Sequence, residues 1–188
     1  VWEDGDADRV AKPAPGTLVL APWLGGHAAQ VITSLYELDG TPSDLDPRHV
    51  LARVMDRFAA DGLVPVVACE LEFYLTDPVR LADGGVQLAL PLKGGERPRL
   101  HGVYGLRELE DFAAFLNGLW ADADIQGIPL ESAISEYAPG QFELTLKHRD
   151  DALRAADEAA MYKRLVKGVA ARNGCEATFM AKPFGDRA

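Results

Sequence analysis

The stretch that decides the fold is residues 64–75, VPVVACELEFYL. Its β-branched and aromatic residues favour a strand. Because side chains alternate across a strand, Glu70 and Glu72 share one face, about 6.5 Å apart. Leu71 and Phe73 point to the opposite face. Two unpaired carboxylates are costly to bury on an apolar strand, so their face is predicted either to meet solvent or to bind cations.

A second acidic segment follows at residues 136–143, EYAPGQFE. If Pro139-Gly140 forms the turn of a hairpin, the opposed pairs are Ala138 with Gln141, Tyr137 with Phe142, and Glu136 with Glu143. Opposed side chains have Cβ atoms about 5 Å apart, and like charges placed there repel each other. A cation between the two glutamates would turn this repulsion into ligation. Pro-Gly favours a type II turn, which fits hairpin twist poorly, so a looser loop that still brings the two glutamates together is the alternative.

The two segments together predict a metal site built from Glu70, Glu72, Glu136 and Glu143. Carboxylate oxygens suit Mg²⁺ or Mn²⁺, and these ions accompany phosphates. Zinc is not expected, because neither segment contains His, and the one cysteine, Cys69, lies in the apolar strand, where a packing role is favoured. The sequence contains neither G-x-x-x-x-G-K-[ST] nor G-x-G-x-x-G, so metals rather than a P-loop lysine would neutralise phosphate charge.

Outward from these segments, strands and helices alternate, which predicts a sheet with helices packed on it. Residues 1–16 are predicted to form a loop. Residues 77–105 are rich in Gly and Pro and are predicted to form a hairpin or a long excursion. The expected strands are 18–20, 29–36, 64–75, 128–136, 141–146 and 177–180. The expected helices run from Pro47, capped by Asp46, to Gly62, over 106–123 with Gly127 as the stop signal, and from Asp151 to Asn173.

Composition excludes several classes. The chain has 188 residues, 48% of them hydrophobic, and a formal net charge of −10 from 29 Asp and Glu against 19 Lys and Arg. This balance is that of a globular protein, and its negative field disfavours nucleic-acid binding. No apolar run approaches the ~20 residues of a membrane helix. With only Cys69 and Cys175, no disulfide framework is expected, which favours a cytoplasmic protein.

These motifs resemble the glutamine synthetase family. The resemblance rests on Glu70-x-Glu72-Phe73-Tyr74-Leu75, on residues 136–143, and on Ala177 to Pro183, in the family's order and spacing. It implies an α+β fold. Residues 1–40 would be the end of an N-terminal β-grasp domain. Residues 41–188 would be the first part of the catalytic domain, an antiparallel sheet with packed helices.

The resemblance also implies an ATP-dependent ligase that joins glutamate to an amine through γ-glutamyl phosphate, with Mg²⁺ or Mn²⁺. Glu72, Glu136 and Glu143 match ligands of the metal on the glutamate side. Glu70 matches a ligand of the metal that holds the ATP phosphates, and Glu131 falls where the family has a nucleotide contact. The family forms homo-oligomeric rings.

Residues 136–141 and Gly5 to Arg9 are more similar to the subgroup that uses polyamines or other large amines, so such an amine is favoured over ammonia. Glutamine synthetase proper is one alternative. A non-catalytic relative and a binding module with solvated acids are two more. Neither terminus resembles a natural one, so we expect an internal piece. The family's histidine and arginine motifs would follow Ala188, and the 188 residues alone are expected to be inactive.

Overall fold

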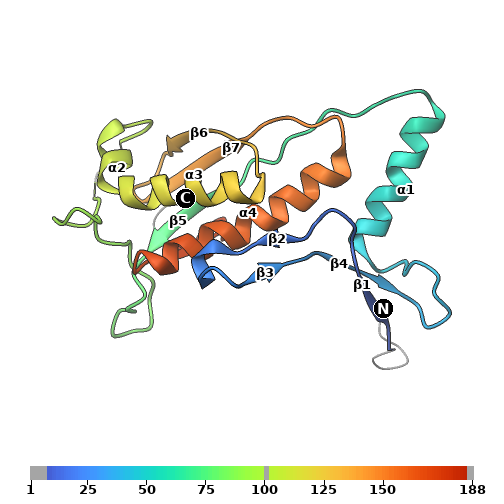
Figure 1. Cartoon of the computed structure of the whole chain (residues 1–188). Helices are drawn as coiled ribbons and strands as arrows, with labels where there is room; N and C mark the ends of the chain where they lie inside the picture. Colours follow the sequence, from blue (N-terminus) through green and yellow to red (C-terminus); the bar gives the residue numbers. More distant parts are fainter. Residues whose placement is uncertain (1–7, 100–101, 186–188) are drawn as a thin grey trace.

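A four-stranded antiparallel sheet with two helices on one face forms the body of this computed structural model, which describes residues 8–99 and 102–185 (Figure 1). The strands lie in the order β6 (Leu130–Ser135), β7 (Gln141–Leu146), β5 (Glu72–Thr76) and β8 (Glu176–Thr178). Helices α3 (Ala113–Gln126) and α4 (Ala152–Arg172) pack on this sheet and on each other. The α+β architecture predicted from the sequence is therefore present.

The main core lies between the sheet and these two helices. Phe73 of β5 lies opposite Phe142 of β7 in the register of the two strands. Both rings are buried, and their centroids are 6.1 Å apart. The other large, fully buried side chains around them include Phe112, Phe115, Leu75, Leu119, Leu144, Tyr162, Leu165, Val166 and Val169. The prediction that Phe73 points to the face opposite the glutamates is therefore confirmed, and that face is the core.

The sequence signals for helix ends are confirmed at α3 and α4. The side chain of Asp151 accepts a hydrogen bond from the Arg154 amide (3.0 Å) and caps the start of α4. Gly127 ends α3 with a φ of +68°, a left-handed conformation that favours glycine. The predicted single helix over 106–123 is wrong, however. It consists of α2 (Leu106–Asp111) and α3, separated at Phe112, whose buried ring packs 5.4 Å from Phe142.

The predicted strand over 64–75 is regular only at its end, in β5. Strand β7 pairs with residues 72–74 and β8 with residues 74–76. Upstream, within the described residues, the chain forms one isolated bridge, between Val67 and Arg149. The apolar residues before Glu70 therefore lie beyond the ends of β7 and β8, so in the part of the chain that the structure describes they have no neighbouring strand to pair with.

The N-terminal part forms two small antiparallel ribbons, one at the lower centre and one at the lower right of Figure 1. Strand β1 (Val10–Pro13) pairs with β4 (Thr33–Tyr36), and β2 (Val19–Leu20) with β3 (Ala29–Gln30). The loop prediction is therefore wrong at β1, where a proline is tolerated because it ends an edge strand. Residues 1–7 of that predicted loop lie outside the described residues. The strand expected over 29–36 is two short strands.

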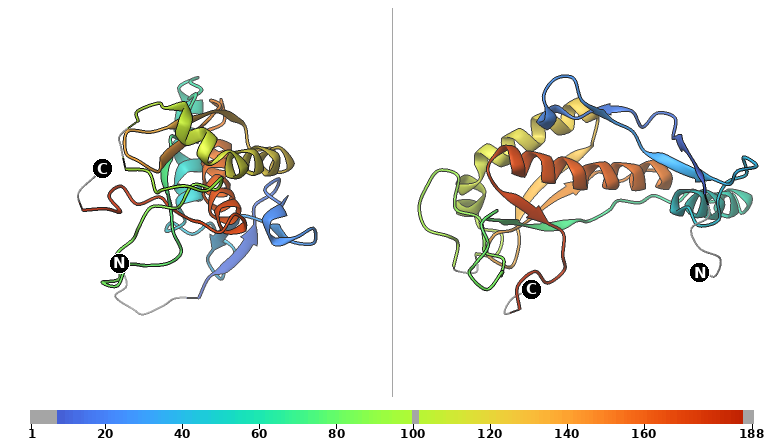
Figure 2. Two further views of the ribbon diagram at one scale, coloured as in Figure 1. Left: turned by 90° about the vertical axis from the view of Figure 1, so that its left-hand side faces the viewer. Right: turned by 90° about the horizontal axis from the view of Figure 1, so that it is seen from below.

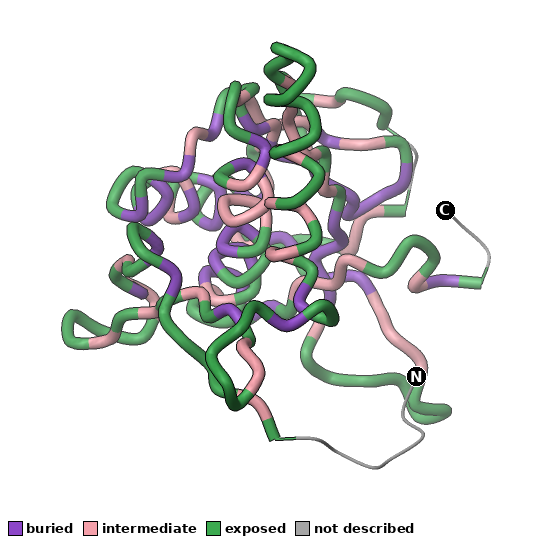
Figure 3. The backbone as a smooth tube through the Cα atoms, turned by 90° about the vertical axis from the view of Figure 1, so that its right-hand side faces the viewer, coloured by how far each residue is buried: buried purple, intermediate pink, exposed green. Residues whose placement is uncertain are grey.

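Helix α1 (Pro47–Ala60) lies at one end of the molecule, away from the sheet (Figure 2). As predicted, Asp46 caps it: its side chain accepts from the amides of Arg48 (2.8 Å) and His49 (3.2 Å). None of the residues of α1 is buried, and Arg48 connects the helix to Asp157 of α4 (3.1 Å). Figure 3 shows the buried residues gathered in the sheet and the helices that cover it.

Residues 77–99 and 102–105 form an excursion rather than a regular hairpin. Leu88 bridges back to Thr76, and the Arg97 side chain binds the Leu88 carbonyl (2.8 Å) and the Asp77 carboxylate. Leu88 packs with Tyr74, Ala138 and Phe184 in a second, smaller core on the face of the sheet that the helices leave open. In the described part of the chain, no helix is long and apolar enough to cross a membrane.

The η1 turn (Pro22–Leu24) joins the N-terminal ribbons to α4 through Trp23, whose ring covers Gly168. A Cβ atom at Gly168 would overlap that ring. We predict that Gly168→Ala lowers the free energy of unfolding by about 1–2 kcal/mol, because overpacking exceeds the gain in helix propensity. Urea denaturation measures this change.

Gly118→Ala in α3 is the matched control. Its Cβ would meet Arg172 Nη2 at 2.9 Å, the end of a flexible side chain. This variant should be neutral or slightly stabilised. Equal stability changes in the two variants would contradict the assigned Trp23 contact.

Candidate metal centre

Three glutamates converge on the face of the sheet opposite α3 and α4. Glu72 comes from β5, Glu143 from β7, and Glu136 directly follows β6. One carboxylate oxygen of each lies within 4.8 Å of the others. Glu143 is buried (7% exposed), Glu136 is half-buried and Glu72 is exposed, so the cluster runs from the interior to solvent.

Strand register produces this convergence. Glu72 lies directly opposite Glu143 in the β5–β7 pair. The like-charge opposition expected from the sequence therefore exists, but between these two residues. The predicted opposition of Glu136 to Glu143 is wrong, because Ser135 pairs with Phe142 and Ile134 with Glu143. The predicted register is shifted by two residues, which keeps Glu136 on the face of Glu143 because the side-chain period of a strand is two.

The Pro139-Gly140 turn explains the shift. Gln141 donates its amide hydrogen to the Ala138 carbonyl (3.0 Å), and Gly140 has a φ of +74°, as the third position of a type II turn requires. Type II turns match the twist of a two-residue hairpin poorly. The loop is therefore longer, and it closes where the Glu136 amide donates to the Gln141 carbonyl (2.8 Å). The predicted pairs of Ala138 with Gln141 and of Tyr137 with Phe142 are wrong for the same reason.

Gln141 connects this loop to the carboxylates. Its side-chain oxygen accepts from the Ala138 amide (3.1 Å), and its Nε2 donates to Glu72 Oε2 (2.5 Å). The amide group thus orients Glu72 while holding the turn. Its position on the face of Glu143 follows from sequence alternation, but its partners do not.

The electrostatics of the cluster oppose ionisation. Burial raises the pKa of Glu143, and the neighbouring charges of Glu70, Glu136 and Glu72 raise it further. Burial also raises the pKa of Glu136, and the charge of Glu72 adds to this effect. Carboxylates arranged in this way would be stabilised in their charged form by a cation.

The residues present fit a divalent metal. The donor set contains only carboxylate oxygens, which Mg²⁺ and Mn²⁺ prefer, and no His or Cys joins the described cluster. Three protein ligands also leave coordination positions for water or for substrate oxygens, as Mg²⁺ usually requires. The chemistry of the cluster is therefore that of a site for a hard cation.

The other two predicted site residues lie outside this cluster. Glu70 is exposed and precedes β5, although its charge reaches Glu143 and Glu136. Glu131 is exposed at an irregularity in the β6–β7 register, between Leu130 and Ser132. The structure thus brings together three of the four predicted metal ligands.

Sequence reasoning missed Glu108 of α2. Its carboxylate accepts hydrogen bonds from the Gly140 amide (2.6 Å) and from the Ser135 hydroxyl (2.9 Å), on either side of Glu136. These partners are 32 and 27 residues away in sequence. No local pattern links residues so far apart.

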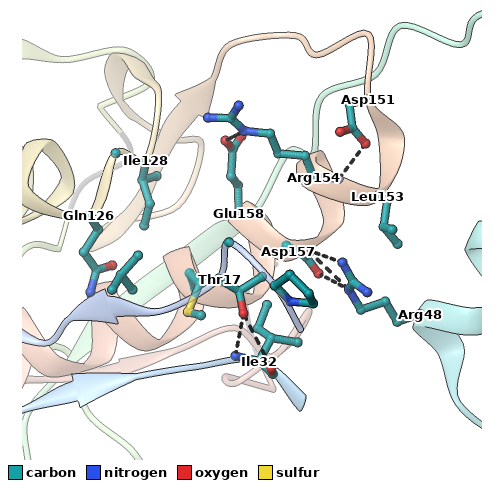
Figure 4. Close-up of a pocket in the computed structure, with 15 residues that line it drawn as sticks. Thr17, Ile32, Arg48, Gln126, Ile128, Asp151, Leu153, Arg154, Asp157 and Glu158 are labelled. Carbon is teal, nitrogen blue, oxygen red and sulfur yellow. Dashed lines mark hydrogen bonds and ion pairs between the residues drawn. The ribbon is translucent and has the colours of Figure 1, made fainter. Parts of the chain in front are cut away.

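A separate cavity of about 440 Å³ lies between the N-terminal ribbons and α4 (Figure 4). Its charged side chains already have partners: Arg48 binds Asp157 (3.1 Å), Arg154 binds Glu158 (2.9 Å), and Asp151 caps α4. None of the three clustered glutamates lines this cavity. It is therefore distinct from the carboxylate site.

Comparisons with known proteins identify the family. The model of the glutamine synthetase catalytic domain matches residues 44–188, so the chain belongs to the glutamine synthetase family. The chain is 39% identical over 186 residues to gamma-glutamylputrescine synthetase PuuA of Escherichia coli, and 34% identical over 185 residues to glutamine synthetase of Mycobacterium tuberculosis. These matches cover 99% and 96% of this chain but 39% of each relative, so the chain spans about two fifths of their length.

Solved structures agree with the fold. A GmaS/ADP complex superimposes with a TM-score of 0.83 at 29% identity, over 98% of this chain and 40% of that one. The chain thus has the mixed helices and antiparallel sheet of a glutamine-synthetase-like fold.

The raised pKa of Glu143 leads to a prediction for metal-free protein. A carboxyl whose folded pKa lies above its ordinary value of 4.5 stabilises the fold below pH 4.5 and loses this contribution as pH rises through the folded pKa. Glu143→Gln should therefore raise Tm at neutral pH by about 2–4 °C, which corresponds to about 1 kcal/mol in the free energy of unfolding. The gain should vanish near pH 4.

Thermal unfolding in EDTA across this pH range measures the effect. Glu110→Gln, at an exposed position on α2, is the control and should show no such pH dependence. A Glu143→Gln gain that is absent, or equal at every pH, would contradict the described electrostatics.

Proposed function

We propose that the protein is an ATP-dependent, glutamine synthetase-type ligase. It forms a γ-glutamyl amide from glutamate and an amine, with γ-glutamyl phosphate as the intermediate. The observation that carries this proposal is the convergence of Glu72, Glu136 and Glu143 within 4.8 Å in a chain of this family. A relative that had lost catalysis would have no need to keep three repelling carboxylates together.

In this proposal Glu72, Glu136 and Glu143 hold one Mg²⁺ or Mn²⁺ ion on the glutamate side. When bound, divalent ions supply charge neutralisation and positioning, which phosphoryl transfer needs more than covalent help. The hydrogen bond from Gln141 orients Glu72 toward its two neighbours. Buried Glu143 fixes the inner end of the site, and exposed Glu72 marks the side open to solvent and substrates.

ATP is the proposed phosphate donor. Glu70 would bind a second ion that holds the ATP phosphates, and Glu131 would contact the nucleotide. Both side chains are exposed and accessible to a ligand, and the charge of Glu70 acts on Glu136 and Glu143. The similarity of the chain to GmaS, whose structure contains ADP, supports a nucleotide at this fold.

An amine larger than ammonia, such as a polyamine, is favoured as the acceptor. The chain is 39% identical to a gamma-glutamylputrescine synthetase, against 34% to glutamine synthetase of Mycobacterium tuberculosis. A glutamate–isopropylamine ligase of a Pseudomonas species and gamma-glutamylethanolamide synthetase GlnA4 of Streptomyces coelicolor are also similar, each at 33% identity. Glutamine synthetase proper, with ammonia as the amine, is the second candidate.

The remaining parts of the proposal concern organisation. Residues 1–40 would end an N-terminal β-grasp domain, and residues 41–188 would begin the catalytic domain. The start of the family match at residue 44 supports this division. The protein would act in the cytoplasm as a homo-oligomeric ring, without nucleic-acid or membrane partners.

Phosphate release from ATP by the full-length protein tests the proposed reaction. The assay contains glutamate, Mg²⁺ or Mn²⁺, and one of putrescine, spermidine, ethanolamine, ammonia or no amine. We expect release that depends on a larger amine and that EDTA abolishes. Release with ammonia alone would instead identify glutamine synthetase proper.

Two variants make this assay specific. Glu136→Gln should lower kcat/KM by more than the about ten-fold loss typical of removing an outer partner of a metal ligand. Glu110→Gln, exposed on α2, should leave it unchanged. No release with any amine, together with no effect of metal on thermal stability, would contradict the proposal and favour a non-catalytic relative.

A further inference from the structure

We infer that Glu108 of α2 is a positioning residue for the carboxylate site, because it holds the segment that carries Glu136. This inference rests on the proposed metal site. Helix α2 then does more than pack on its neighbours: through the Glu108 side chain it holds the loop from Ser135 to Gly140 in place.

The geometry is that of a two-point clamp. One carboxylate oxygen of Glu108 accepts from the Gly140 amide at 2.6 Å, and the other accepts from the Ser135 hydroxyl at 2.9 Å. Ser135 and Gly140 are both buried, so solvent cannot readily replace these bonds. Both ends of the loop are therefore held by the same carboxyl group.

The clamp is itself supported. Just before α2, the Tyr104 amide donates to the Ser135 carbonyl (3.0 Å), so this region binds Ser135 at two groups. Just after α2, the buried Phe112 ring packs edge-on against Phe142 of β7 (5.4 Å between centroids). Glu108 thus approaches the loop from an element that is anchored at both ends.

The clamped segment leads to two of the three clustered glutamates. Glu136 lies within it, next to Ser135. Ala138 also lies within it, and its amide binds Gln141, which in turn donates to Glu72. Displacement of the loop would move Glu136 away from Glu143 and remove the Ala138 contact that holds Gln141, the residue that orients Glu72. Outer partners of metal ligands commonly contribute 10–100-fold, as an order of magnitude, to metal affinity.

The clamp requires hydrogen bonds rather than charge. A glutamine at position 108 can accept from the Gly140 amide through its oxygen and donate from its NH₂ to the Ser135 hydroxyl, which can also act as an acceptor. An alanine can do neither. The conservative variant should therefore retain the position of the loop, whereas alanine should release it.

Two measurements on wild type, Glu108→Ala, Glu108→Gln and the α2 control Glu110→Ala test this inference. Hydrogen exchange reads the Gly140 amide and the peptide around residues 135–141 without metal. A Mn²⁺ titration followed by electron paramagnetic resonance gives the affinity. We expect Glu108→Ala to lose protection in this peptide and to bind Mn²⁺ about ten-fold or more weakly. Glu108→Gln and Glu110→Ala should lose far less than the about ten-fold that removal of an outer partner typically costs.

The outcomes separate the two proposals. Wild type that fails to bind Mn²⁺ would contradict the proposed function, while the exchange data would still decide the role of Glu108. Unchanged exchange and unchanged affinity in Glu108→Ala would overturn the inference. So would a Glu108→Gln variant as impaired as Glu108→Ala, because it would show that charge and not the clamp is required.

Discussion

The antiparallel register of β5 and β7 is the constraint on which the body of this protein depends. Glu72 opposite Glu143 and Phe73 opposite Phe142 are consecutive pairs of one ladder. Because side chains alternate, the same register that buries the two rings against the helices brings the two carboxylates together on the other face. A slip of one residue would send glutamates into the core and aromatic rings out of it.

Core packing and charge repulsion therefore oppose each other within a few residues. The rings of Phe73, Phe142 and Phe112 form a buried aromatic group that favours this register. The raised pKa of Glu143 shows that a charged carboxylate is unfavourable beside this aromatic group. A sheet selected for stability alone would gain from a neutral residue at either position, and sites that break a local rule in this way are commonly functional. A bound cation removes the conflict without changing the fold.

Much of this arrangement could be predicted from sequence, because it depends on local patterns. Alternation placed Glu72 and Glu143 on the faces opposite Phe73 and Phe142, and capping residues such as Asp46 and Asp151 marked the starts of helices. The Pro-Gly pair indicated that the loop could be looser than a two-residue hairpin, but its exact length could not be predicted, because it depends on how a type II turn meets the twist of two strands. The contacts of Glu108 could not be predicted for another reason: its partners lie 27 and 32 residues away in sequence and contact it only in the folded protein. Helix α2 ends at Phe112, whose backbone leaves the helical conformation (φ −113°, ψ 20°) although the apolar spacing continues through it.

Anomalous diffraction from crystals grown with Mn²⁺ tests most directly whether the three carboxylates form a metal site. The expected result is an anomalous peak at coordination distance from oxygens of Glu72, Glu136 and Glu143, with the remaining positions taken by water or substrate. A saturating concentration of Mn²⁺ that leaves no peak among these three side chains, or that gives an ordered ion only elsewhere, would contradict it.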